Sequence, residues 1–192
     1  MTTSSFTRPT RTDSTNVGRS PRPIPRLFEV TATAAVVFSG LFAGMLLAMA
    51  VLESSMRGLA ATVYTQVRLI ELDRLGGLAT ILLIPAIIAT AALAWSAFRR
   101  RGAGRWVTLT ALLLLLTAFA ISVAINVPIN TAQQGWSVAA PPSDWSGVRD
   151  RWQLAHVART ATAALAFVLL AAVTTDRRSR QGNATQAQPA CP

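Results

Sequence analysis

Four long apolar stretches constrain this chain more than any other feature. They cover residues 28–52, 78–98, 106–127 and 157–175, and the second and third contain no charged side chain. About 20 residues of helix, at roughly 1.5 Å each, cross the hydrocarbon core of a bilayer. Because a backbone inside lipid has to satisfy its own hydrogen bonds, each stretch is predicted to be a helix. The predicted fold class is therefore all-α, a four-helix transmembrane bundle.

The composition also favours a membrane protein over a soluble domain. Only 14% of the 192 residues are charged and the mean hydropathy is +0.42, whereas soluble domains carry about 25% charged residues. A net charge of +10 would suit nucleic acid. The arginines, however, lie between the apolar stretches and not along one face, so we expect the lipid bilayer as a partner and no nucleic acid. The predicted location is the cell membrane, with several spans.

The placement of arginine predicts the orientation of the bundle. Twelve of the 18 arginines lie in residues 1–27, in the loop 99–105 or in residues 176–192. Because cytoplasmic loops carry the excess of basic residues, both termini and this loop are predicted to be cytoplasmic. The two terminal segments have no apolar periodicity and are expected to be disordered tails around a membrane domain at 28–175. A cleaved signal peptide is the alternative for the first stretch, although its apolar part is longer than signal peptides have.

Polar and aromatic residues gather in the outward connections. The third stretch ends in Asn-Val-Pro-Ile-Asn at residues 126–130, and a loop with Trp136 follows. Four residues that open the fourth stretch are spaced by three, four and three, so they share one helix face: Arg149, Trp152, His156 and Arg159. An arginine inside a span is costly in lipid, so Arg159 is expected to point into the bundle.

The first outward connection is also predicted to be helical. Apolar residues recur there at helical spacing, at Met56, Leu59, Val63, Val67 and Ile70. This helix would continue the first span or lie on the membrane surface. Tyr64, Gln66 and Arg68 lie on the same segment, where some of them could reach an outer cavity.

Structural explanations compete with functional ones for several of these residues. Asn126 and Asn130 would cap a helix that is broken at Pro128. Trp136 would be an interfacial anchor, and Arg149 would belong to a solvated charged rim. In the first span, Gly40 and Gly44 form a small-residue row that is expected to pack within the bundle, with a homo-oligomer as the alternative.

Two segments resemble the anthrone oxygenase family. They are Asn-Val-Pro-Ile-Asn with the Trp-containing loop, and Arg-Trp-x-x-x-His-x-x-Arg-Thr at residues 151–160, within a similarity that extends over about 29–175. The resemblance implies a four-helix membrane protein that oxidises an aromatic polyketide-like substrate with molecular oxygen and without a metal or other cofactor. A single histidine and a single cysteine agree with this, since they cannot form a metal-binding cluster. A non-catalytic protein that binds a small molecule or lipid, or supports a membrane complex, is the alternative.

The resemblance also implies roles for residues of an outward-facing pocket. His156 would be the base that removes a substrate proton, because the ordinary pKa of histidine lies near working pH. Arg159 or Arg149 would hold the developing oxyanion, and the flat substrate would stack on Trp152 or Trp136. The remaining candidates for substrate binding are Asn126, Asn130, Tyr64 and Gln66.

The orientation is tested by the single thiol of the chain, Cys191. A membrane-impermeant maleimide should label Cys191 only after cells are opened, because the C-terminal segment is predicted to be cytoplasmic. A Cys191→Ser chain carrying Ser137→Cys in the outward loop should be labelled in intact cells. Labelling of Cys191 in intact cells would reverse the orientation.

Overall fold

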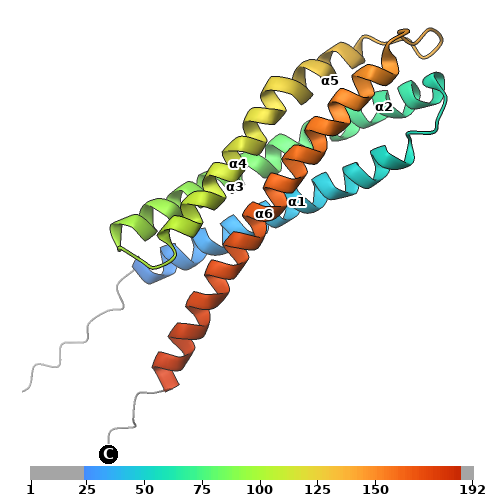
Figure 1. The fold of residues 1–192 in the computed structure, drawn as a ribbon. Coiled ribbons are helices and arrows are strands. Elements are labelled where there is room, and N and C mark those ends of the chain that lie inside the picture. Colours follow the sequence, from blue (N-terminus) through green and yellow to red (C-terminus); the bar gives the residue numbers. More distant parts are fainter. Residues whose placement is uncertain (1–23, 187–192) are drawn as a thin grey trace, which may run out of the picture.

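Residues 24–186 are described by a computed structural model, and they contain six α-helices, one π-helical turn and no strand (Figure 1). The elements are α1 (Ile24–Ser55), α2 (Ala61–Leu75), α3 (Leu78–Arg99), α4 (Arg105–Ile121), the π turn η1 (Ser122–Asn126), α5 (Val127–Gln134) and α6 (Trp145–Gln186). The predicted all-α fold is confirmed for this part of the chain.

Four helical segments of the described chain are long and apolar enough to cross a membrane. They are Phe28–Ser55, Leu78–Arg99, Arg105–Gln134 and Trp145–Arg177. The four predicted spans are confirmed, although the third and fourth helical segments extend well beyond them. Of the expected tails, residues 1–23 and 187–192, with Cys191, lie outside the described residues.

The long helices pack in a ring in which α1 and α4 each lie between α3 and α6 (Figure 1). Small side chains fill much of the interior, and Ala35, Ala86, Ala111, Ala118, Ala163 and Ala166 are completely buried. Large apolar side chains such as Leu47, Ile81 and Ile88 are exposed on the outside. This distribution suits a bundle in lipid, where small residues allow helices to approach closely and apolar side chains can face the hydrocarbon.

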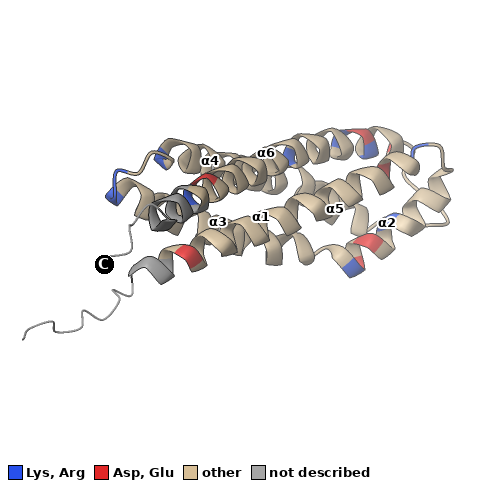
Figure 2. Ribbon diagram, turned by 90° about the horizontal axis from the view of Figure 1, so that it is seen from below, with Lys and Arg blue, Asp and Glu red and all other residues tan. Residues whose placement is uncertain are grey.

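Charged residues lie mainly towards the two ends of the bundle (Figure 2). The loop between α3 and α4, which carries Arg100 and Arg101, lies at the same end as the start of α1 and the end of α6 (Figure 1). The opposite end is formed by α2, α5 and the beginning of α6. This common placement is what the arginine-based topology requires, and the cytoplasmic orientation of that end remains a prediction.

The short helix α2 turns its polar side towards the bundle. Tyr64, Arg68 and Glu71 are buried, whereas Val63 and Ile70 of the apolar stripe are 45% and 58% exposed. The helix predicted for the first outward connection is present over Ala61–Leu75. Its apolar stripe covers the outside of the molecule and its polar side chains face protein, the opposite of an amphipathic helix on a soluble domain.

Only one glycine of the predicted small-residue row makes a close helix contact. A Cβ atom on Gly40 would lie 2.9 Å from the ring of Phe167 on α6, whereas one on Gly44 would have no atom within 4 Å. The expectation that both glycines pack inside the bundle therefore does not hold for Gly44, which is exposed.

This difference predicts unequal effects of two matched substitutions. Gly40→Leu should lower the melting temperature in detergent, because the new side chain enters the space of Phe167. Gly44→Leu, one helical turn away, should leave it nearly unchanged. Equal melting temperatures for the two variants would contradict the described packing of α1 against α6.

Candidate functional site

Arg68 lies at the centre of a buried polar network. Its Nη1 donates hydrogen bonds to Glu53 Oε1 at 3.1 Å and to Glu71 Oε2 at 3.0 Å. Its Nε donates to Gln133 Oε1 at 2.9 Å, and its Nη2 to Asn130 Oδ1 at 2.7 Å. These partners come from α1, α2 and α5, so one guanidinium connects three helices. A buried arginine needs such compensation, because an unpaired charge in a low-dielectric interior is costly.

Trp152 of α6 connects this network to the histidine. Its indole centroid lies 3.9 Å from the guanidinium carbon of Arg68, and its Nε1 donates a 2.7 Å hydrogen bond to Asn130 Oδ1. The imidazole of His156 stacks on the indole at 4.7 Å with an interplanar angle of 10°. The tryptophan is therefore held by a cation–π contact, a hydrogen bond and a stacked ring.

Both ring nitrogens of His156 are engaged. Nε2 lies 2.9 Å from the carbonyl oxygen of Leu46, which can only accept, so Nε2 carries the proton. Nδ1 then accepts a 2.8 Å hydrogen bond from Nη2 of Arg159. Arg159 also donates to Ser122 Oγ at 3.2 Å. The prediction that Arg159 points into the bundle is confirmed, because it is 8% exposed.

The π turn η1 places polar residues of the third span towards the same region. In an α-helix, side chains four residues apart are rotated relative to one another around the helix axis, because one turn contains 3.6 residues. A π turn contains more residues per turn and therefore offsets this rotation. Ser122, Asn126 and Asn130 therefore all line one cavity. The amide of Asn126 donates to the carbonyl oxygen of Trp152 at 3.3 Å, and Asn126 caps no helix through its side chain. The capping explanation is therefore wrong for Asn126, and Pro128 lies in the first turn of α5 without ending the helical segment.

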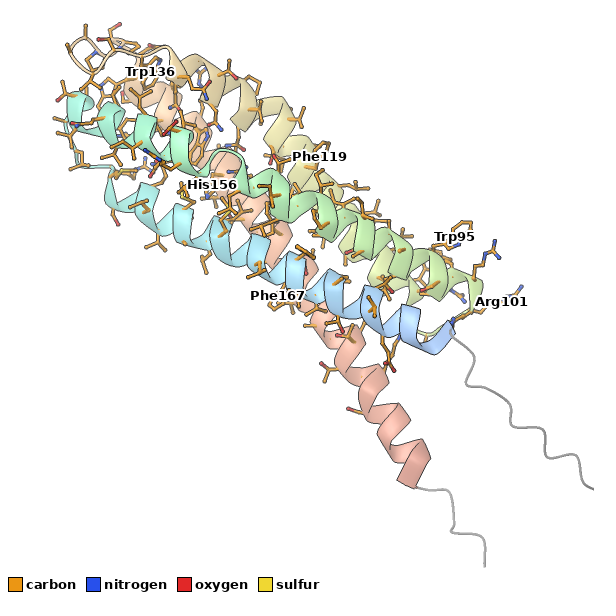
Figure 3. All side chains as sticks on the ribbon, turned by 180° about the vertical axis from the view of Figure 1, so that it is seen from behind. Trp95, Arg101, Phe119, Trp136, His156 and Phe167 are labelled. Carbon is orange, nitrogen blue, oxygen red and sulfur yellow. The ribbon has the colours of Figure 1, made fainter. Side chains whose placement is uncertain are left out.

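The cavity has a volume of about 120 Å³ and lies between α1, α2, α3, the α4–α5 segment and α6. Its polar wall includes Arg68, Glu71, Ser122, Asn126, Asn130 and Arg159, with Trp152 and Thr80 beside them. Phe42, Met45, Leu72 and Leu83 form much of the apolar wall. The exposed side chains Ile84, Phe119, Val123 and Val127 mark its mouth on the side of the bundle, and Figure 3 shows Phe119 on the outside of the α4–η1 segment.

Two acceptor atoms of the cavity residues have no hydrogen-bond partner among the described residues. They are Oε1 of Glu71 and Oδ1 of Asn126, and both are buried. Burial raises the pKa of the Glu71 carboxyl above its ordinary value, and the nearby charge of Glu53 adds to this effect, while the hydrogen bond from Arg68 lowers it. The cavity therefore offers unpartnered acceptors that suit the hydroxyl groups of a ligand.

Four of the predicted site residues line the cavity together. They are Asn126, Asn130, Trp152 and Arg159. His156 lies directly behind Trp152 and does not line this cavity, although the predicted common face of α6 is confirmed by the burial of all four of its residues.

The other predicted site residues lie away from the cavity. Tyr64 is buried against Trp145, with ring centroids 5.4 Å apart, and burial together with the charge of Glu53 raises the pKa of its hydroxyl. Arg149 belongs to an outer cluster, where it donates to the carbonyl oxygen of Arg57 and to Asp150. Gln66 is exposed, and Trp136 lies in the outer loop (Figure 3).

The two carboxylates and the glutamine that hold Arg68 carry no clear signal in the sequence. The sequence patterns do not predict Glu53, Glu71 or Gln133 as site residues. They place Arg68 on the predicted helix of the first outward connection without assigning it a role. A weak signal is the pair Arg68 and Glu71, spaced by three on the side of α2 opposite its apolar stripe. Within residues 24–186, no three His, Cys, Asp or Glu side chains come together in a way that could hold a metal ion.

The fold and the site define a multi-pass helical membrane protein with a polar cavity near one end of the bundle. Residues 77–169 match the model of the anthrone oxygenase family, which confirms the predicted resemblance over α3 to the middle of α6. Over these residues the chain is similar to the anthrone oxygenase family. The helices α1 and α2, which carry Glu53, Arg68 and Glu71, precede the matched segment. Searches of curated proteins and of solved structures give no match.

The buried network predicts a large difference between two arginines. Arg68→Met should lower the free energy of unfolding by about 3–5 kcal/mol, because it leaves two buried carboxylates without their cation. Arg57→Met removes an exposed ion pair with Asp150 and should cost at most about 1 kcal/mol. Denaturant unfolding in detergent measures both, and a similar small cost for the two variants would contradict the network.

Proposed function

We propose that the protein is an oxygenase that uses molecular oxygen, without a metal or other cofactor, to oxidise a flat aromatic polyketide-like substrate in the cell membrane. The match to the anthrone oxygenase family supports the reaction class. The observation in this chain that supports the proposal most directly is the cavity beside Arg68, which combines a polar wall with an apolar mouth.

The mouth of the cavity suits a substrate that is dissolved in lipid. Ile84, Val123 and Val127 are exposed there, and they lie on helical segments that are long and apolar enough to cross a membrane. A hydrophobic molecule can therefore pass from the bilayer into the cavity without crossing water. One of its hydroxyl groups would donate a hydrogen bond to Oδ1 of Asn126, and Oε1 of Glu71 would remain as a second unpartnered acceptor beside the substrate.

The polar wall suits an aromatic molecule that becomes an anion during the reaction. Removal of a proton from an acidic carbon makes the ring system electron-rich enough to react with oxygen. The guanidinium groups of Arg68 and Arg159 would stabilise the resulting oxyanion in a site of low polarity. An apolar cavity of about 150 Å³ holds one benzene ring, so a larger ring system requires the flexible side chains of Met45 and Met49 to move aside.

The role of His156 as the base remains a prediction from the resemblance. In the described arrangement its Nδ1 accepts a hydrogen bond from Arg159. The histidine would have to exchange this bond for a substrate proton. Without such an exchange, His156 orients Arg159 at the wall of the cavity.

The proposed function is tested by oxygen uptake with an anthrone-type substrate, using purified protein in lipid nanodiscs after treatment with a chelator. Substrate-dependent uptake should persist, and Val123→Trp should lower kcat/KM roughly tenfold, equivalent to about 1.4 kcal/mol, by narrowing the mouth. Ile125→Trp is the matched control, since Ile125 is also exposed on η1 but does not line the cavity. Tight binding without oxygen uptake would favour the non-catalytic alternative, and loss of uptake with chelator would exclude the cofactor-free reaction.

A further inference from the structure

The two buried carboxylates beside Arg68 differ in how their oxygens are used. Glu53 has both oxygens occupied, since Oε1 accepts from Arg68 and Oε2 accepts from Nε2 of Gln153 at 3.0 Å. Glu71 has only Oε2 held by Arg68, while Oε1 is buried and has no hydrogen-bond partner among the described residues. Glu71 lines the cavity and Glu53 does not. One carboxylate oxygen at the cavity wall is therefore free to accept a proton.

No other side chain of the cavity wall is equally suited to accept a proton. Arg68 and Arg159 are cations, and Asn126 and Asn130 are amides with negligible basicity. His156 lies behind Trp152, and both of its ring nitrogens are already engaged. Tyr64 is buried against Trp145 and does not line the cavity.

We propose that Glu71 is the general base of the oxygenase reaction and that Arg68 and Arg159 hold the substrate anion that this base produces. The proposal rests on the proposed function and assigns a catalytic role to a residue outside the segment that matches the family. Its substrates are hydrophobic aromatic molecules with an acidic methylene group that is conjugated to a carbonyl or phenol.

The charges around Glu71 fit this task. Glu53 from α1, Tyr64 and Arg68 from α2, and Arg159 from α6 surround the network. Burial raises the pKa of Glu71, which makes its carboxylate a stronger base than an exposed glutamate. When the proton moves from the substrate to Glu71, the negative charge moves onto the substrate. Arg68 and Arg159 then have the substrate anion as their negatively charged partner.

The reaction balances with oxygen as the oxidant. Oε1 of Glu71 takes one proton from the methylene carbon, and the electron pair that remains on this carbon attacks molecular oxygen to form a carbon–oxygen bond. The proton on Glu71 converts the peroxide anion to a hydroperoxide. Glu71, which is again a carboxylate, takes the second hydrogen of the same carbon as a proton. The electron pair of that carbon–hydrogen bond forms the carbonyl group while the oxygen–oxygen bond breaks, and the hydroxide that leaves takes the proton from Glu71 to form one molecule of water.

Exchange of the methylene hydrogens with deuterated water, measured without oxygen, isolates the step assigned to Glu71. The wild-type protein in nanodiscs should catalyse exchange of an anthrone-type substrate above the protein-free rate. Glu71→Gln keeps a side-chain oxygen for Arg68 but removes the base, and should lower catalysed exchange by about 10²–10⁴-fold. Asp73→Asn is the matched control, because Asp73 is an exposed carboxylate on the same helix, and it should leave exchange unchanged.

The same measurement separates the two candidate bases. His156→Gln should reduce exchange by much less than Glu71→Gln if Glu71 is the base. Full exchange by a folded Glu71→Gln variant, or an equal loss in His156→Gln alone, would overturn the assignment. If the Gln variant does not fold, Glu71→Asp decides instead, because its shorter carboxylate should slow exchange roughly tenfold and unchanged exchange would overturn the proposal.

Failure of the proposed function gives a different result. A wild-type protein that catalyses neither exchange nor oxygen uptake is not an oxygenase for such substrates, and the assignment of Glu71 fails with it. A wild-type protein that catalyses both, with Glu71→Gln unaffected, retains the proposed function and loses only the assignment of the base.

Discussion

The buried guanidinium of Arg68 is the interaction on which the arrangement of the site depends. A charge removed from water has to be neutralised and hydrogen-bonded, and the partners of Arg68 come from three helices. This requirement holds α2 against the bundle with its polar side inward. It also fixes Asn130 and Trp152, and through Trp152 the position of His156. A second arginine, Arg159, is held by His156 and by Ser122 at the start of the π turn.

The lipid environment explains why this polar interior is compatible with an apolar exterior. In water, burial of apolar surface would favour a helix such as α2 with its stripe of Val63 and Ile70 inside. At the surface of a bilayer such a stripe can contact lipid, whereas Arg68 and Glu71 are buried and have to find protein partners. The same reasoning places a cavity with an apolar mouth and a polar wall on the side of the bundle, where a lipid-soluble molecule can reach it.

The sequence predicted those features that follow from hydropathy and helical period. The four spans and the shared face of Arg149, Trp152, His156 and Arg159 are of this kind, and the structure confirms them. The acidic partners were not predicted, because a charged residue on a helix outside the spans is normally assigned to the solvent side. Glu71 lies on such a helix, and its inward direction depends on Arg68 and on the packing of α2 against α5.

Other features depend on three-dimensional register, which local patterns do not encode. The π turn before Pro128 keeps Asn126 and Asn130 on one side of the third span, although a proline two residues after Asn126 predicts a broken helix equally well. Gln66 and Arg68 are two residues apart on α2 and therefore point in different directions, so only one of them reaches the network. The loop residue Trp136 shares its neighbourhood in sequence with Asn130 but lies outside the cavity.

Photolabelling tests most directly that the cavity beside Arg68 is the binding site for a hydrophobic aromatic molecule. An anthraquinone-type label in nanodiscs should, on irradiation, attach to residues 42–49 of α1 and 119–127 of the α4–α5 segment, where the cavity is lined. The competing location is a more open cavity of about 800 Å³ near the other end of the bundle, lined by Phe28, Val37, Phe38 and Thr174. Labels found by mass spectrometry mainly at that end, and absent from residues 42–49 and 119–127, would contradict the account.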